Sequence, residues 1–162
     1  CIGLDISDKM IADAKELNQF IPNCTFVLNT EGSLQRFSDD YFDIIYTNIV
    51  LQHLPNKATI YGYISEFIRT LKVNGLLVFQ LPSSLPFIVR IQPRRSLYVL
   101  LRMLGFSPKF LYWKLGLHPI RMRFISEKEM VIFLNSIGGK VLEIQRHKDP
   151  NFLRHCIYYV TK

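Results

Sequence analysis

The sequence lacks long apolar runs and has few cysteines, and each shortage excludes a class of protein. No apolar stretch approaches the roughly 18 residues that a membrane-spanning helix needs. The three cysteines, Cys1, Cys24 and Cys156, form neither a CxxC pair nor a zinc-binding spacing. We therefore expect free thiols in a reducing compartment, no disulfide framework and no metal site.

Acidic residues are absent from the segment 67–126, which carries ten lysine and arginine residues. The whole chain has 20 basic and 13 acidic residues, so the rest of the chain is slightly acidic. The formal net charge of +7 therefore comes from one segment and not from the whole fold.

The length of 162 residues is that of one domain. We expect a single domain over residues 1–162 with a cap inserted at about 83–123. Because the chain begins with Cys1 inside a strand-like run, we also expect an N-terminal portion to precede it. Any targeting signal would then lie upstream of Cys1.

Hydrophobic periodicity predicts strands that alternate with helices. The fold class is therefore α/β, with a doubly wound, mostly parallel Rossmann-like sheet, a C-terminal antiparallel hairpin and a small basic-aromatic helical cap. Asn74-Gly75 is predicted to stop a helix, and Pro82 to end a strand. The predicted strands are 1–6, 24–29, 42–47, 76–81, 141–145 and 156–160, and the predicted helices are 8–20, 57–72, 95–104, 109–115 and 127–137.

The stretch 42–55 is the first candidate site. Its β-branched residues Ile44 and Ile45 predict a central strand that is covered on both faces. Asn48, Gln52 and His53 follow within six residues, at the carboxyl end of that strand. In open α/β sheets ligands bind outside the carboxyl ends of the strands, so we expect chemistry here.

Several segments together resemble a class I S-adenosylmethionine (SAM)-dependent methyltransferase. The segment GLDISDKMI at 3–11 is similar to the second strand and following helix of that family, 42–55 to the fourth strand and its loop, and 71–82 to the fifth strand. The closing hairpin is also a feature of the family. The resemblance implies SAM as cofactor and methyl transfer as activity. It also implies that the first strand and its glycine-rich loop lie before Cys1.

The resemblance implies roles for four cofactor-binding residues. Asp5 would accept hydrogen bonds from both ribose hydroxyls, because a carboxylate is an acceptor-only group. Ile6 would lie against the adenine ring, and Glu31 would contact its amino group, although the register within 29–31 stays open. Asn48 would face the methionine end. The alternatives are a helix N-terminal charge for Asp5, a core position for Ile6 and a solvated turn for Glu31.

His53 is the candidate catalytic residue. Imidazole titrates near neutral pH, so His53 could take a proton from a substrate hydroxyl. The alternative is a histidine that caps the next helix or packs under the loop. Gln52, Arg94 and Arg95 are predicted to contact the substrate. Methyl transfer depends mainly on proximity, alignment and water exclusion, so no catalytic triad is expected.

The basic and aromatic cap allows several interpretations. It could cover a small anionic acceptor, lie on a membrane surface near a lipid-linked substrate, or bind nucleic acid. It could also be a solvated basic face over an aromatic core. We favour a small or lipid-linked acceptor over nucleic acid, in the cytoplasm or at the inner face of a membrane. The alternatives to a methyltransferase are a non-catalytic binding or scaffold protein and a nucleotide-binding oxidoreductase, which the antiparallel hairpin disfavours.

Overall fold

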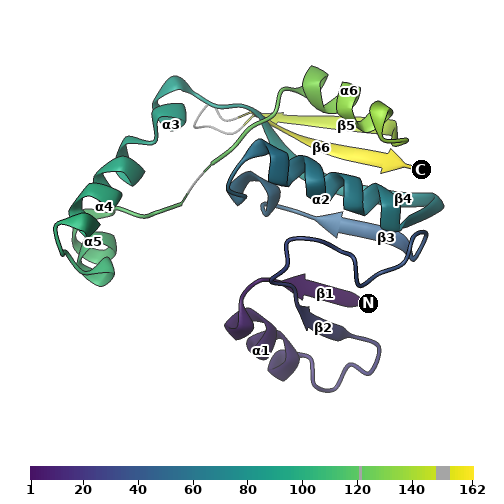
Figure 1. Ribbon diagram of the computed structural model, residues 1–162, viewed down its shortest axis with the longest axis horizontal. Helices are drawn as coiled ribbons and strands as arrows, with labels where there is room; N and C mark the ends of the chain where they lie inside the picture. Colours follow the sequence, from purple (N-terminus) through teal and green to yellow (C-terminus); the bar gives the residue numbers. More distant parts are fainter. Residues whose placement is uncertain (121, 149–153) are drawn as a thin grey trace. The chain divides into compact units, whose positions relative to one another are not determined.

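The computed structural model describes residues 1–120, 122–148 and 154–162. These residues form two compact units, 1–34 and 35–162. Figure 1 shows the helices and strands of each unit, which are described separately below.

The unit 1–34 is a βαβ arrangement. Strand β1 (Ile2–Asp5) runs parallel to β2 (Thr25–Leu28), and helix α1 (Asp8–Leu17) connects them. The side chain of Ser7 caps α1 by accepting a hydrogen bond from the backbone N of Met10 at 3.3 Å. The helix ends three residues earlier than the predicted end at Phe20. The reason is that Asn18 donates from both its backbone N and its side-chain amide to the carbonyl of Ala14.

The unit 35–162 contains a four-stranded sheet in the order β3-β4-β6-β5. β3 and β4 are parallel, whereas β6 is antiparallel to both β4 and β5. The predicted α/β fold with a C-terminal antiparallel hairpin is therefore confirmed. The elements are β3 (Phe42–Thr47), a short 3-10 helix η1 (Leu51–His53), α2 (Lys57–Thr70), β4 (Leu71–Ser84), α6 (Glu127–Ser136), β5 (Lys140–Lys148) and β6 (Arg154–Thr161).

The core of this unit lies between the sheet and the helices α2 and α6, which cover the same face in Figure 1. Alternate residues of β4 point to that face, and Leu77, Phe79 and Leu81 have no exposed surface. The ring of Phe79 stacks on that of Tyr158 at 4.8 Å between centroids. The helix positions predicted to face the sheet, Ile60, Ile64, Phe67, Ile68 and Leu71, are all buried.

Strand β3 is covered on one face only within the described residues. The side chains of Ile44 and Tyr46 are 64% and 69% exposed, and β3 pairs with β4 alone. Ile45 and Thr47 point to the opposite, partly buried face because side chains alternate along a strand. Within the unit 35–162, β3 therefore has one partly buried face and one exposed face, in place of the predicted cover on both.

Strand β4 is longer than the predicted strand 76–81. It begins directly after α2 and continues through Pro82 to Ser84, so neither predicted boundary is correct. Asn74 has a φ of +63°, and the register with β3 is irregular at this point, so Asn74-Gly75 turns the strand instead of ending the helix. A Cβ on Gly75 would lie 2.9 Å from the carbonyl O of Asp43, which explains the glycine.

The cap consists of three helices, α3 (Phe87–Ile91), α4 (Pro93–Met103) and α5 (Pro108–Leu115). The two predicted pieces correspond to α4 and α5, and α3 was not predicted. Gln92, at a φ of +51°, separates α3 from α4. After the cap, the backbone N of Ile125 donates to the carbonyl of Pro82 at 3.1 Å. Among the residues that the structure describes, no helix is long and apolar enough to cross a membrane.

Candidate functional site

Asp5 ends β1 and is partly buried. Its Oδ1 accepts a hydrogen bond from the backbone N of Ser7 at 2.8 Å, which fixes the start of α1. Its carbonyl O accepts from the backbone N of Asn29 at the end of β2, also at 2.8 Å. Within the described residues, Oδ2 has no hydrogen bond or ion pair. Asp5 therefore supports the helix and retains one carboxylate oxygen for a ligand.

The other two predicted cofactor residues of this unit are exposed. Ile6 follows Asp5 directly and is 72% exposed, so its side chain is not part of a core in the described chain. Glu31 is exposed in a turn where Gly32 has a φ of +69°. Of the residues 29–31, Asn29 is the one bonded to Asp5 and is only 8% exposed. The structure thus brings Asp5, Ile6 and Asn29 together, with Glu31 two residues further along.

The loop that leaves β3 in the other unit is strained. Asn48 is exposed, and Ile49 has a φ of +60°, a conformation that β-branched residues rarely adopt. The buried side chain of Gln80 holds it, because Oε1 accepts from the backbone N of Ile49 at 3.2 Å. Backbone strain of this kind is concentrated at functional sites. Sequence reasoning missed Gln80, although it is the only polar residue in the apolar run 76–81.

His53 is exposed at the end of the short 3-10 helix, whereas the neighbouring Gln52 is buried. The Nε2 atom of Gln52 lies 3.1 Å from Nε2 of His53. An amide nitrogen only donates, so this contact is a hydrogen bond when Nε2 of His53 accepts. Gln52 therefore contacts the imidazole directly from the buried side of the loop.

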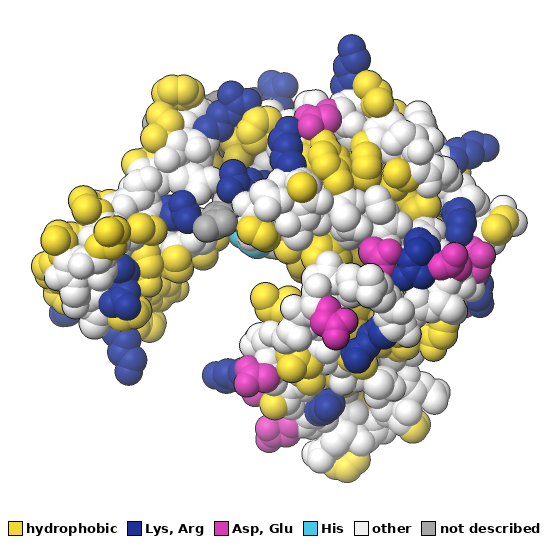
Figure 2. Space-filling view, viewed as in Figure 1, with side chains coloured by type: hydrophobic (Ala, Val, Ile, Leu, Met, Phe, Trp, Pro, Cys, Tyr) yellow, Lys and Arg dark blue, Asp and Glu magenta, His cyan; other side chains and the backbone are white. Residues whose placement is uncertain are grey.

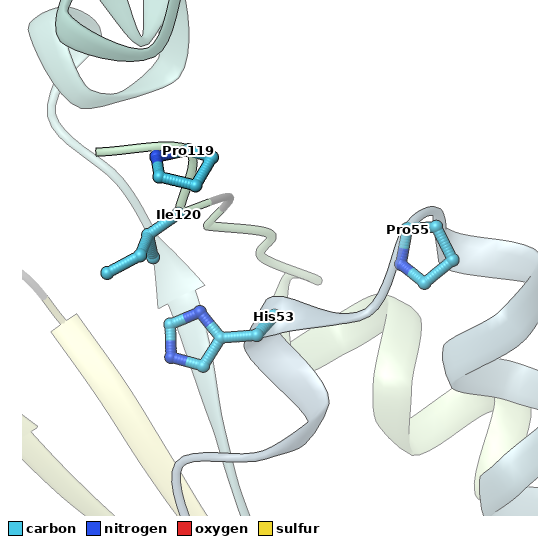
Figure 3. Close-up of a pocket in the computed structure, with 4 residues that line it drawn as sticks. All are labelled: His53, Pro55, Pro119 and Ile120. Atoms are coloured by element: carbon cyan, nitrogen blue, oxygen red, sulfur yellow. The ribbon is translucent and has the colours of Figure 1, made fainter. Parts of the chain in front are cut away.

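A cavity of about 440 Å³ opens beside His53. Its lining residues come from the loop after β3 and from the segment after α5, and they are His53, Pro55, Pro119 and Ile120 (Figure 3). In Figure 3 the imidazole ring points toward Ile120. The volume is in the range of small-molecule sites, and one imidazole faces otherwise apolar walls.

Arg123 connects the two sides of this cavity. Its backbone N donates to the carbonyl of Gln52, and its Nη2 donates to the carbonyl of Pro55, both at 2.8 Å. The guanidinium thus ties the His53 loop to the segment that returns from the cap. Arg123 was among the basic residues of the cap region, but its positioning role was not predicted.

The predicted substrate residues Arg94 and Arg95 lie in the first turn of α4. Arg94 is exposed and Arg95 is partly buried. Within the described residues, neither side chain lines the cavity at His53. The structure therefore does not place these two arginines in the wall of the cavity beside His53.

An ionic cluster holds α2 against the start of α6. Glu129 accepts from Lys57 Nζ at 2.9 Å and from the Tyr61 hydroxyl at 2.6 Å. The bonds from Lys57 and Tyr61 hold the pKa of Glu129 below its usual value, whereas burial raises the pKa of Tyr61. The part of the chain that the structure describes contains no cluster of three or more histidine, cysteine, aspartate or glutamate residues arranged to hold a metal ion.

Comparisons with known proteins identify the family of the chain. Residues 1–103 match the model of a methyltransferase domain family. The curated trans-aconitate 2-methyltransferase of Enterobacter sp. (strain 638) is 31% identical over 83 residues, which are 51% of this chain. The chain spans only 29% of the length of that relative.

Solved structures show the same fold. A SAM-dependent methyltransferase from Methanosarcina mazei has a TM-score of 0.72 at 18% identity, over 99% of this chain and 81% of that chain. Magnesium protoporphyrin IX methyltransferase from Synechocystis, solved with bound SAH, has a TM-score of 0.61 at 17% identity, over 99% and 63%. The family match covers well over half of the residues, and the chain therefore belongs to the methyltransferase domain family.

Proposed function

We propose that the whole protein is a SAM-dependent methyltransferase that acts on a small or lipid-linked acceptor. The observation that carries the proposal is Asp5, a partly buried carboxylate at the end of a parallel strand in a chain of the methyltransferase domain family. Because the chain spans only part of its curated relative, the activity is proposed for the whole protein and not for the chain alone.

The side chains at the strand ends suit SAM. Oδ2 of Asp5 is available to accept from the ribose hydroxyls, and the exposed side chain of Ile6 offers an apolar surface to the adenine ring. Glu31 remains the proposed contact of the adenine amino group, with Asn29 as the alternative, and Asn48 remains that of the methionine end. SAM would supply an electrophilic methyl carbon on a sulfonium. The residues of the chain then need only to hold, align and desolvate the reactants.

The cavity beside His53 is the proposed acceptor site. The curated relative is named for trans-aconitate, a small carboxylate, which supports a small anionic acceptor. Gln52 and His53 would contact the acceptor, and Arg94 and Arg95 would attract its negative charge. For an acceptor hydroxyl, His53 would take the proton at Nε2 after the contact with Gln52 opens. We keep the cytoplasm, with peripheral contact at a membrane, as the proposed location.

Isothermal titration calorimetry of the whole protein with SAM tests the proposal. We expect saturable binding of one SAM and no binding of NADH. With trans-aconitate as the first acceptor tested, S-adenosylhomocysteine release would identify turnover. A protein that fails to bind SAM would be the non-catalytic scaffold, and a protein that binds NADH instead would be an oxidoreductase; either result would reject the proposal.

A further inference from the structure

The helices α4 and α5 expose an unusual amount of apolar surface. Leu97 and Leu100 of α4 and Leu104, the residue at its C-cap, follow helical spacing and are 46%, 54% and 67% exposed. No residue of α4 is buried. On α5, Trp113 is 77% exposed. We call the segment 93–115, which contains both helices, the cap hairpin.

The cap hairpin carries charge of one sign. Its five charged residues are all basic, and they are Arg94, Arg95, Arg102, Lys109 and Lys114. Figure 2 shows hydrophobic and basic side chains next to each other over this part of the molecule, with no acidic side chain among them on the visible face.

Two of these basic residues lie where a positive charge destabilises the helix. Arg94 and Arg95 lie in the first turn of α4, where the helix dipole disfavours a positive charge. No acidic residue offsets them in that turn. The two arginines therefore weaken the helix that carries them, and an anionic partner outside the hairpin would compensate for this cost.

We propose that the cap hairpin docks on the surface of an anionic lipid bilayer. A short helix with basic residues on one side and leucines on the other is suited to the membrane–water interface. Trp113 and Tyr112 add aromatic side chains of the kind that lie at the headgroup level. The lysines and arginines then pair with lipid phosphates, and the leucines enter the acyl boundary.

The positive charge of the cap hairpin argues against a second copy of the chain as its binding partner. A symmetric dimer through this surface would place ten basic side chains, five from each copy, opposite one another without an acidic partner from either hairpin. Nucleic acid would satisfy the charge but would not cover the leucine face of α4. A bilayer with anionic headgroups satisfies both the charge and the apolar face.

This inference rests on the lipid-linked form of the proposed function, but its test requires neither SAM nor an acceptor. Trp113 is the only tryptophan of the chain, so its fluorescence reports directly on the cap hairpin. The whole chain is titrated with phosphatidylcholine vesicles that contain about 30% phosphatidylglycerol, at low salt. We expect a blue shift of the Trp113 emission and its quenching by brominated lipid acyl chains.

Two variants separate the contribution of the basic residues to vesicle binding from that of the leucines. The triple variant Arg94→Gln, Lys109→Gln and Lys114→Gln should bind vesicles on the order of 100-fold more weakly, at about fivefold for each charge. The double variant Leu100→Gln and Leu104→Gln should bind but lose most of the bromolipid quenching. The matched control Lys9→Gln, Lys128→Gln and Lys140→Gln removes the same charge from exposed residues outside the hairpin and should bind like the wild type.

Three results would overturn the proposal. The first is the absence of a Trp113 shift with anionic vesicles at low salt. The second is equal weakening by the control variant, which would indicate a general charge effect. The third is a Trp113 shift that depends on protein concentration without vesicles, or one that appears with single-stranded DNA and not with lipid. Loss of vesicle binding with SAM binding retained would leave the proposed methyl transfer unaffected.

Discussion

Replacing Asp5 with asparagine should separate its role at the start of α1 from its proposed role in SAM binding. The asparagine Oδ1 can still accept from the backbone N of Ser7, so the cap of α1 is preserved and the free energy of unfolding should fall by less than about 1 kcal/mol. The second carboxylate oxygen becomes an amide NH₂, which donates and cannot accept from a ribose hydroxyl. The loss of one charge-assisted hydrogen bond, about 1.5 kcal/mol or more, predicts SAM binding weakened at least about tenfold.

Calorimetry of SAM binding to the whole protein measures this effect, and thermal unfolding measures the stability. Asp8→Asn is the matched control, because Asp8 is exposed in the first turn of α1 and loses the same charge nearby. Asp5→Ala removes the acceptor for Ser7 as well, so it should also lower stability by about 0.5–2 kcal/mol.

The reasoning would be refuted by an Asp5→Asn protein that binds SAM within twofold of the wild type. Equal weakening by Asp8→Asn would also refute it, because the effect would then come from the loss of charge and not from a contact. A large loss of stability in Asp5→Asn would show that the helix start needs the charge itself.

Three further predictions concern the loop after β3 and the ionic cluster. Ile49→Asn should raise the free energy of unfolding by about 0.5–1 kcal/mol, because asparagine tolerates the positive φ; a lower midpoint in urea would contradict this. Arg123→Gln should raise the KM for the acceptor about tenfold, through loss of a charge-assisted bond to the carbonyl of Pro55, and leave the Kd for SAM unchanged; a change in SAM affinity alone would contradict the positioning role. Glu129→Gln should cost about 0.5–1 kcal/mol at pH 7, since the ion pair with Lys57 is partly exposed. The folded pKa of Glu129 is lowered, so this stabilisation is fully present above the unfolded pKa and is lost as the pH falls through the lowered folded pKa; the urea midpoints of the wild type and the variant should therefore converge as the pH is lowered into the acidic range.

Features set by neighbouring residues were predictable from the sequence. Ser126 caps α6, because its Oγ accepts from the backbone N of Glu129 only three residues away. The start of β4 was not predictable in the same way. Asn74-Gly75 has the composition of a helix end, but the pairing of Leu71 with Phe42 of β3 ends the helix earlier. That pairing is a contact between distant residues, and it determines which element the turn belongs to.

In the candidate site, too, contacts between distant residues were harder to predict than local features. Asp5 and Asn48 were chosen as candidates because of their positions relative to predicted strand ends, and the structure places Asp5 at the end of β1 and Asn48 directly after β3. Gln80 and Arg123 were not found because they act on backbone groups 31 and 68 residues away. Backbone groups carry no sequence signal, so side chains that only position a loop escape detection.

The contact between Gln52 and His53 bears on the class of acceptor. With Nε2 of His53 accepting from Gln52, the lone pair that a general base needs is already engaged. A hydroxyl or amine acceptor must lose a proton, so it requires that contact to open first. A carboxylate is already deprotonated at neutral pH and requires no base. A carboxylate acceptor would therefore leave the Gln52 contact in place, whereas a hydroxyl or amine acceptor would require it to open.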